Sequence, residues 1–237
     1  MKKYSKCLEV CCGSLASALA AVEGGADRIE LCSALSLDGL TPSLGTLCVL
    51  HRSFPDLRIH VLIRPREGEF VYTEAEVQVM EQDICNAVDA GASAFVCGAL
   101  TPGGTIDLPV TTRLVQAAGG LPFTFHRAFD LVPDKTEALQ QLSTLGVARI
   151  LTSGGASTAE DGIPVLRQLI LMSASLHHPV TIMPGGGVNR HNVKRIIKET
   201  GAMEIHGSCS ISLPDGQRQT AADEVRAVLN SLSNTCG

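Results

Sequence analysis

Two short stretches near the N-terminus carry the same pair of reactive side chains. The sequences "LEVCC" at 8–12 and "IELCS" at 29–33 each place a glutamate two residues before a cysteine, as Glu9 with Cys11 and Glu30 with Cys32. Paired thiols form a soft site that suits Cu(I). Paired carboxylates serve general acid–base catalysis or balance buried cations. The residue types leave both kinds of chemistry open, and Cys12 leaves open which of two neighbouring thiols faces the site.

Apolar runs rich in Val, Ile and Phe alternate along the chain with longer amphipathic stretches. The predicted strands are 6–11, 27–31, 59–64, 93–97, 122–126, 149–152, 180–184 and 203–207. The predicted helices are 14–24, 43–53, 73–90, 107–118, 134–145, 159–175, 189–200 and 219–232. Eight such units in 237 residues, with no linker-like change in composition, are typical of a (β/α)8 barrel. We therefore predict an α/β fold with a single TIM-type barrel domain over residues 1–237.

Helix starts support this division of the chain. Capping residues precede five of the predicted helices, at Ser14, Ser43, Thr73, Asp107 and Asn189. An open, doubly wound sheet is the alternative architecture, but no G-x-G-x-x-G follows the first strand. A dinucleotide-binding fold therefore has little support.

Alternation along the strands predicts which side chains point into the barrel. Apolar residues at every second position suit the helix side, which turns the residues between them inward. The predicted inward set is Glu9, Cys11, Glu30, Cys32, Arg64, His126 and His206. If the first two strands align in register, Glu9 lies beside Glu30 and Cys11 beside Cys32. Because barrel ligands bind at the C-terminal ends of the strands, these groups are expected to form a polar pocket at that mouth.

The carboxylates of this pocket have two interpretations. One is acid–base work, with a proton shared between Glu9 and Glu30 and with His126 or His206 assisting. The other is an internal salt-bridge network that holds the mouth of the barrel together. The cations available to balance the carboxylates are Arg64, Arg66 and Arg127.

Glycine-rich loops follow the later strands. The loops "TSGG" and "MPGGGV" and the strand end "HGSCS" offer backbone N–H groups and hydroxyls where many barrels hold phosphate. The predicted anion-binding residues are Thr152, Ser153, Gly185, Gly186, Gly187 and Ser208. No H-x-H or HExxH spacing supports a catalytic zinc site.

Composition excludes several classes of partner. A net charge of −5 and 3% aromatic residues argue against nucleic acid, and no apolar run approaches the roughly 20 residues that cross a bilayer. Nine cysteines, an odd number without CxxC spacing, favour reduced thiols in the cytoplasm over a disulfide scaffold. Glu9 and Gly13 interrupt the apolar stretch that a signal peptide would need.

Long motifs spread over nearly the whole chain resemble the CutC copper homeostasis family. They are "LEVC", "GGADRIELCSAL", "TPSLG", "LIRPREGEF", "GALTPGGTID", "FTFHRAFD", "RILTSGG", "MPGGGV" and "HGS". The resemblance implies a cytosolic TIM-type barrel that assembles as a homo-oligomer and binds copper through Cys11 and Cys32. It also implies a shared polar set at the mouth, formed by Glu9, Glu30, Arg64, His126, Arg127, Asp130 and His206. The chain departs from the family pattern at Cys12-Gly13, at "LDGL", and at Glu67 and Glu69.

Three hypotheses follow from these observations. The first is a copper homeostasis protein that binds Cu(I) through the thiols of Cys11 and Cys32. The second is an enzyme that acts on a small anionic substrate, phosphorylated or not, through the pocket of Glu, Arg and His side chains. The third is an interaction scaffold in which the polar groups serve only stability.

Overall fold

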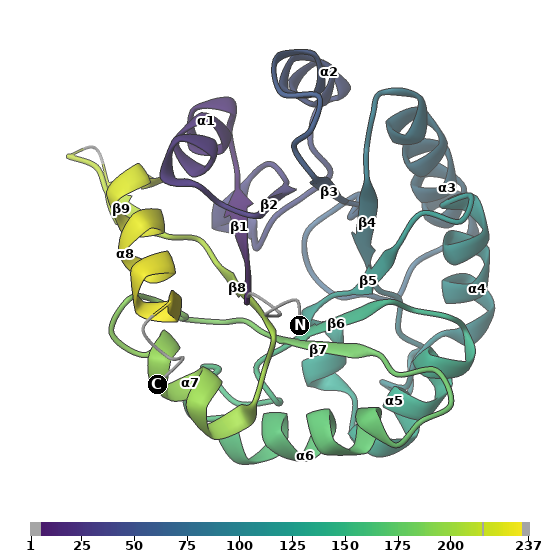
Figure 1. The fold of residues 1–237 in the computed structure, drawn as a ribbon. Helices are drawn as coiled ribbons and strands as arrows, with labels where there is room; N and C mark the ends of the chain where they lie inside the picture. Colours follow the sequence, from purple (N-terminus) through teal and green to yellow (C-terminus); the bar gives the residue numbers. More distant parts are fainter. Residues whose placement is uncertain (1–5, 215, 234–237) are drawn as a thin grey trace.

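A computed structural model describes residues 6–214 and 216–233, in which short strands form a central barrel surrounded by helices (Figure 1). The barrel strands are β1 Cys7–Cys12, β2 Arg28–Leu31, β3 Ile59–Leu62, β4 Ala94–Cys97, β5 Phe123–Phe125, β6 Arg149–Thr152, β7 Thr181–Pro184 and β8 Glu204–Gly207. The helices are α1 Leu15–Gly24, α2 Leu44–Ser53, α3 Glu74–Asp89, α4 Leu108–Ala117, α5 Lys135–Thr144, α6 Ile163–Ala174, α7 Val193–Thr200 and α8 Ala222–Ser233.

The strands form one parallel sheet that curls into a nearly closed barrel. Hydrogen-bonded neighbours run in the order β7-β6-β5-β4-β3-β2-β1-β8. At the seam between β7 and β8 a Cβ placed on Gly185 would lie 3.3 Å from the Cβ of His206, so the two strand ends touch. The predicted (β/α)8 architecture is confirmed.

Local sequence explains where most helices begin. The side chains of Ser14, Ser43, Thr73 and Asp107 each accept a hydrogen bond from a backbone N–H of the first turn, as predicted. The prediction for Asn189 is wrong, because α7 begins at Val193. The Asn189 side chain instead donates to the Gly187 carbonyl and accepts from the His191 N–H, which closes a turn before the helix.

Two kinds of element were not predicted. The helix predicted from residue 219 begins at Ala222, because β9 Ser210–Ser212 and β10 Arg218–Thr220 form an antiparallel hairpin after β8. Two short 3-10 helices, η1 Leu35–Leu37 and η2 Arg127–Leu131, follow β2 and β5. These insertions lie after strand C-terminal ends and therefore shape the mouth of the barrel.

The apolar core lies between the strands and the helices. The outward-facing residues Leu8, Val10, Ile29 and Leu31 are completely buried there. Burial of such side chains stabilises the fold by about 1.5–3 kcal/mol each. No helix in the described part of the chain is both long and apolar enough to span a membrane.

Candidate functional site

Charged side chains fill the lumen beneath the mouth of the barrel. Glu9 is completely buried, and its carboxylate accepts a hydrogen bond from Arg28 Nε at 2.7 Å. The same carboxylate lies 2.8 Å from His60 Nδ1 and 2.9 Å from His206 Nδ1. Burial would raise the pKa of Glu9, but its hydrogen bonds and the charge of Arg28 hold that pKa well below its usual range. A fully buried anion is thus stabilised by three basic groups.

The network continues below Glu9 toward the other end of the barrel. Arg28 also binds Glu204, and Arg149 Nε donates to Glu204 at 2.7 Å. The cations expected to balance the carboxylates lie elsewhere. Arg66 pairs with Glu76 on α3, so this part of the prediction is wrong.

The predicted register of the first two strands is also wrong. The Cα partner of Glu9 is Arg28, and that of Cys11 is Glu30. Strands of a closed barrel are tilted and staggered, so residues at equal distances from the strand ends do not lie side by side. Glu9 and Glu30 therefore belong to successive layers of the lumen, while Glu30 lies beside Cys11.

Two thiols nevertheless meet above this network. Cys11 Sγ lies 3.7 Å from Cys32 Sγ, and both side chains are buried in a small cluster with Leu62 and Val96. Cys12 faces the helices instead, where its thiol is 3.4 Å from the Val10 carbonyl. The hydrogen bond with Cys32 and burial raise the pKa of Cys11 well above its usual range. The Cys11 thiol is therefore protonated until a metal displaces its proton.

Cys11 also belongs to a group of mixed ligands. Its sulfur and ligand atoms of Glu30 and His206 all lie within 4.8 Å of one another. His206 Nε2 is 3.7 Å from Glu30 Oε2. Burial would lower the pKa of His206, but Glu30 and the hydrogen bonds with Cys11 and Glu9 raise it well above its usual range. Burial raises the pKa of Glu30.

Arg64 and His126 occupy the opposite part of the mouth. Arg64 donates hydrogen bonds to the carbonyls of Leu37, Gly39 and Gly68. Its guanidinium therefore links the loop after β2 to the loop after β3. The His126 ring lies 4.7 Å from that of Phe70. Burial, with the charge of Arg64, lowers the pKa of His126 to about 3.

The carboxylate of Asp130 occupies the position at the "TSGG" loop where an anion was predicted to bind. Its carboxylate accepts hydrogen bonds from the Thr152 hydroxyl, the Ser153 N–H at 3.0 Å and the Gly155 N–H at 3.0 Å. Arg127 Nε donates to the same carboxylate at 2.8 Å. Thr152 and Ser153 thus bind an anion of the protein itself, and the structure does not bring them into the mouth pocket.

A pocket of about 450 Å³ opens at the mouth above Cys11. Gly186, Gly187 and Ser208 line it as predicted residues, whereas Gly185 packs against Leu151 and does not. The full lining is Cys11, Asp38, Arg127, Gly186, Gly187, Val188, Asn189, His206, Gly207, Ser208, Cys209, Ser210, Arg218, Glu224 and Val228. Two arginines, two serines, Cys11 and His206 therefore share one accessible space.

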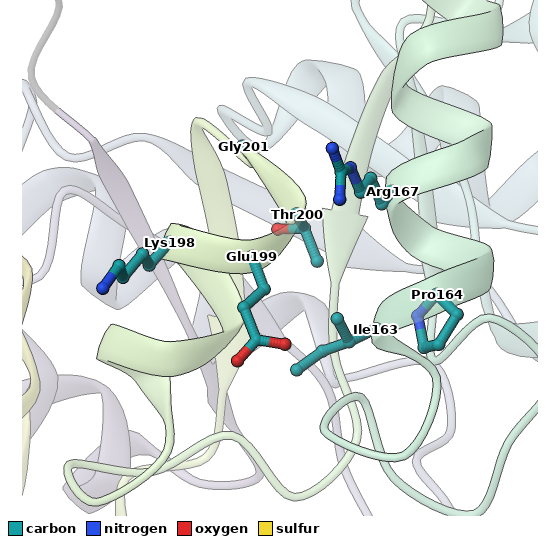
Figure 2. Close-up of a pocket in the computed structure, with 7 residues that line it drawn as sticks. All are labelled: Ile163, Pro164, Arg167, Lys198, Glu199, Thr200 and Gly201. Atoms are coloured by element: carbon teal, nitrogen blue, oxygen red, sulfur yellow. The ribbon is translucent and has the colours of Figure 1, made fainter.

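A second hollow lies on the outside of the barrel. It separates α6, with Ile163 and Arg167, from the last turn of α7, with Lys198, Glu199 and Thr200 (Figure 2). It contains none of the residues predicted for a site. The mouth pocket is therefore the better candidate.

Several residues of the lumen and the mouth were not predicted from the sequence. Arg28 lies two positions before Glu30, and Glu204 lies two positions before His206, so both point into the lumen. His60 lies four positions before Arg64 and points inward for the same reason. Alternation could therefore have predicted all three. Arg218 could not be found in this way, because it reaches the pocket from the β9–β10 hairpin.

Comparisons with known proteins agree with the geometry. The model of the CutC family matches residues 6–211. A family protein CutC from Bacteroides fragilis is 46% identical over 216 residues, covering 91% of this chain and 84% of that protein. The copper homeostasis protein cutC homolog of Homo sapiens is 44% identical over 211 residues, covering 89% and 76%.

Two solved structures resemble this chain to different degrees. The crystal structure of CutC from Streptococcus agalactiae has a TM-score of 0.81 and 34% identity, covering 86% of this chain and 98% of that one. Phosphoribosyl anthranilate isomerase from Thermotoga maritima, at 13% identity and a TM-score of 0.64, shares the barrel fold alone. With matching motifs, matching architecture and relatives of this identity, the chain belongs to the CutC family.

Proposed function

We propose that this protein binds Cu(I) as its cargo in copper homeostasis, through the thiols of Cys11 and Cys32. The observation that carries the proposal is the 3.7 Å separation of the two sulfur atoms, one on β1 and the other directly after β2. Thiolate ligands select Cu(I) over harder ions. Relatives named as copper homeostasis proteins support the assignment.

The surroundings of the thiols fit this cargo. Cys11 lines the mouth pocket, which provides an entry path, while Cys32 is 2% exposed. Leu62 and Val96 complete an apolar cluster around the sulfurs. Such a shell limits the access of water to bound copper.

The cellular setting is part of the proposal. The eight cysteines in the described part of the chain are all free, which fits a reducing cytoplasm. The family resemblance favours a homo-oligomer. Light scattering of the purified protein over a range of concentrations tests the oligomer, and a single species of monomer mass would contradict it.

The experiment is an anaerobic competition for Cu(I) against a chelator of known affinity. The parent protein is expected to bind one Cu(I) tightly. Cys11→Ser with Cys32→Ser is expected to lose this binding. Cys12→Ser is the matched control, because it removes a buried neighbouring thiol that faces the helices.

Two results would contradict the proposal. One is tight binding that survives loss of both lumen thiols, which would place copper elsewhere. The other is parent binding too weak to compete with millimolar glutathione, because the cytosolic thiol pool would then strip the metal. Melting curves of each variant without copper separate loss of binding from loss of fold.

The mouth pocket supports a second candidate, an enzyme that acts on a small anionic substrate. Arg127 and Arg218 face the same 450 Å³ space as Ser208 and the backbone of Gly186 and Gly187. An oxyanion bound there is expected to raise the melting temperature with concentration. Inorganic phosphate should therefore stabilise the parent more than Arg218→Ala, with Arg195→Ala on the surface of α7 as the control. Equal melting curves with and without phosphate would count against this candidate.

A further inference from the structure

Three ligand atoms of different chemistry converge from three adjacent strands. Cys11 lies on β1, Glu30 on β2 and His206 on β8, and β1 pairs with both of the other strands. Their ligand atoms lie within 4.8 Å of one another, a separation that a single ion can span. The three residues are 19 and 176 positions apart in sequence, which is why no short spacing motif reveals the group.

Glu9 holds one of these ligands in the orientation that metal binding needs. His206 Nδ1 is 2.9 Å from Glu9 Oε1, which leaves Nε2 on the side of Glu30. Glu9 is itself held by Arg28 at 2.7 Å. A carboxylate on the far nitrogen of a histidine is the usual support of a metal-bound imidazole, because it fixes the ring and its tautomer.

The ligand set selects a different metal from the thiol pair. One sulfur, one nitrogen and one carboxylate oxygen suit a divalent ion of borderline softness, and Zn²⁺ accepts all three. Cu(I) is served by Cys11 and Cys32 and gains little from a carboxylate. The two arrangements share Cys11, so one ion excludes the other.

Two of the three ligand residues line the mouth pocket, so an open fourth position would face it. Cys11 and His206 line the pocket, and Arg127, Arg218 and Ser208 surround the same space. Structural zinc sites are closed by four protein ligands, whereas reactive sites keep three and leave one position open. Arg127, Arg218 and Ser208 can donate to an oxyanion there, in a space that the carboxylates of Asp38 and Glu224 also line.

We propose that Cys11, Glu30 and His206 bind a divalent ion, with Zn²⁺ as the best match, and that a small oxyanion completes its coordination from the mouth pocket. Cys32 takes no part in this site. The proposal goes beyond Cu(I) binding and shares with it only Cys11.

Cobalt provides the first test, because Co²⁺ replaces Zn²⁺ and gives a thiolate charge-transfer band. Apo-protein prepared anaerobically is titrated with Co²⁺ alone and then with Zn²⁺. The parent and Cys32→Ser are expected to show the band at equal intensity, and Zn²⁺ should abolish it. Cys11→Ser should lack the band. A band that survives Cys11→Ser, or one that disappears in Cys32→Ser, would overturn the ligand assignment.

Glu30→Gln separates the two metals. This nearly isosteric change is expected to weaken Zn²⁺ binding at least about tenfold, and Glu9→Gln to weaken it by about 10–100-fold through loss of the support for His206. Cu(I) affinity should be unchanged in Glu30→Gln and lost in Cys32→Ser. Zn²⁺ affinity that is unchanged in Glu30→Gln would overturn the divalent site while leaving the Cu(I) proposal intact. A parent protein that binds Zn²⁺ but not Cu(I) would overturn the Cu(I) proposal and leave the divalent site intact.

Inorganic phosphate tests the open position. Its addition is expected to change the visible bands of the Co²⁺ protein, and Arg218→Ala should require about tenfold more phosphate for the same change. Arg218 suits this test because it lines the pocket, where its Nε donates to Ser210 Oγ at 3.0 Å. Visible bands that do not respond to phosphate would show a closed site and overturn this part of the proposal. Each variant is first compared with the parent in melting curves without metal.

Discussion

His206 Nδ1 lies 2.9 Å from Glu9 Oε1, inside a barrel lumen where most barrels place aliphatic side chains. This contact joins the deep ionic network of Glu9, Arg28 and His60 to the ligand group at the mouth. The same glutamate therefore serves two purposes: it balances the charge of Arg28, and it fixes the ring of His206.

The first prediction concerns the cost of removing that glutamate. Glu9→Ala is expected to lower the free energy of unfolding by about 3–5 kcal/mol, because Arg28 would stay buried without one of its partners. Urea unfolding measures the change. Glu160→Ala, which removes an exposed pair with Arg195, is the control and should cost about 0–1 kcal/mol. Similar losses in both variants would contradict a special role for the buried network.

The second prediction is a pH dependence that comes from His126. Its pKa is lowered to about 3 in the folded protein, against about 6.5 in an unfolded chain. A depressed pKa contributes stability that is complete above about pH 6.5 and is lost as the pH falls toward 3, at up to about 1.4 kcal/mol per pH unit.

His126→Gln removes this titration. Between about pH 5 and 6.5 the free energy of unfolding of the variant should fall less steeply than that of the parent. His206, whose pKa is raised, is present in both proteins and therefore contributes equally to both slopes. Urea unfolding at several pH values measures both slopes, and equal slopes would show that His126 takes up a proton without unfolding.

The third prediction tests the role of Asp130. Asp130→Ala removes the acceptor of the buried Thr152 hydroxyl and Ser153 N–H, and it should cost about 2–4 kcal/mol through these unsatisfied donors. Asp161→Ala, which removes an exposed contact with Thr158, is the control. Equal free energies of unfolding for Asp130→Ala and the parent would show that this carboxylate is not structural.

The sequence predicted the barrel and much of its lumen for a simple physical reason. Alternation has a period of two, so it identifies which face Cys11 and His206 share without any knowledge of their neighbours. Register depends on the tilt and stagger of the closed barrel, which no single strand reveals. The pairing of Cys11 with Glu30, and with it the mixed ligand group, therefore required the structure.

For the loop after β6, the local sequence was insufficient for a different reason. The sequence "TSGG" offers N–H groups and hydroxyls, but it does not show that Asp130 arrives from the preceding unit to accept them. The arrival of Arg218 from the β9–β10 hairpin was equally hidden, because no strand was predicted between residues 207 and 219. Contacts between loops depend on tertiary structure, and local patterns carry no signal for them.

The fourth prediction concerns the glycine at the seam of the barrel. A Cβ on Gly185 would lie 2.4 Å from Leu151 Cδ1 and 3.3 Å from His206 Cβ. Gly185→Ala should therefore displace Leu151 and cost about 1–3 kcal/mol by overpacking. It should also weaken Zn²⁺ binding, because His206 is pushed from the position that Glu9 sets, whereas Cu(I) binding by Cys11 and Cys32 should persist.

Gly45→Ala is the matched control for this change. Gly45 lies in α2 with no atom within 4 Å of an added Cβ, so alanine there should be neutral or stabilising by up to about 1 kcal/mol. Melting curves and metal titrations of the two variants provide the comparison. If Gly185→Ala kept full stability and full Zn²⁺ affinity, the seam would be looser than the structure shows, and close packing of Gly185 could not be what positions His206.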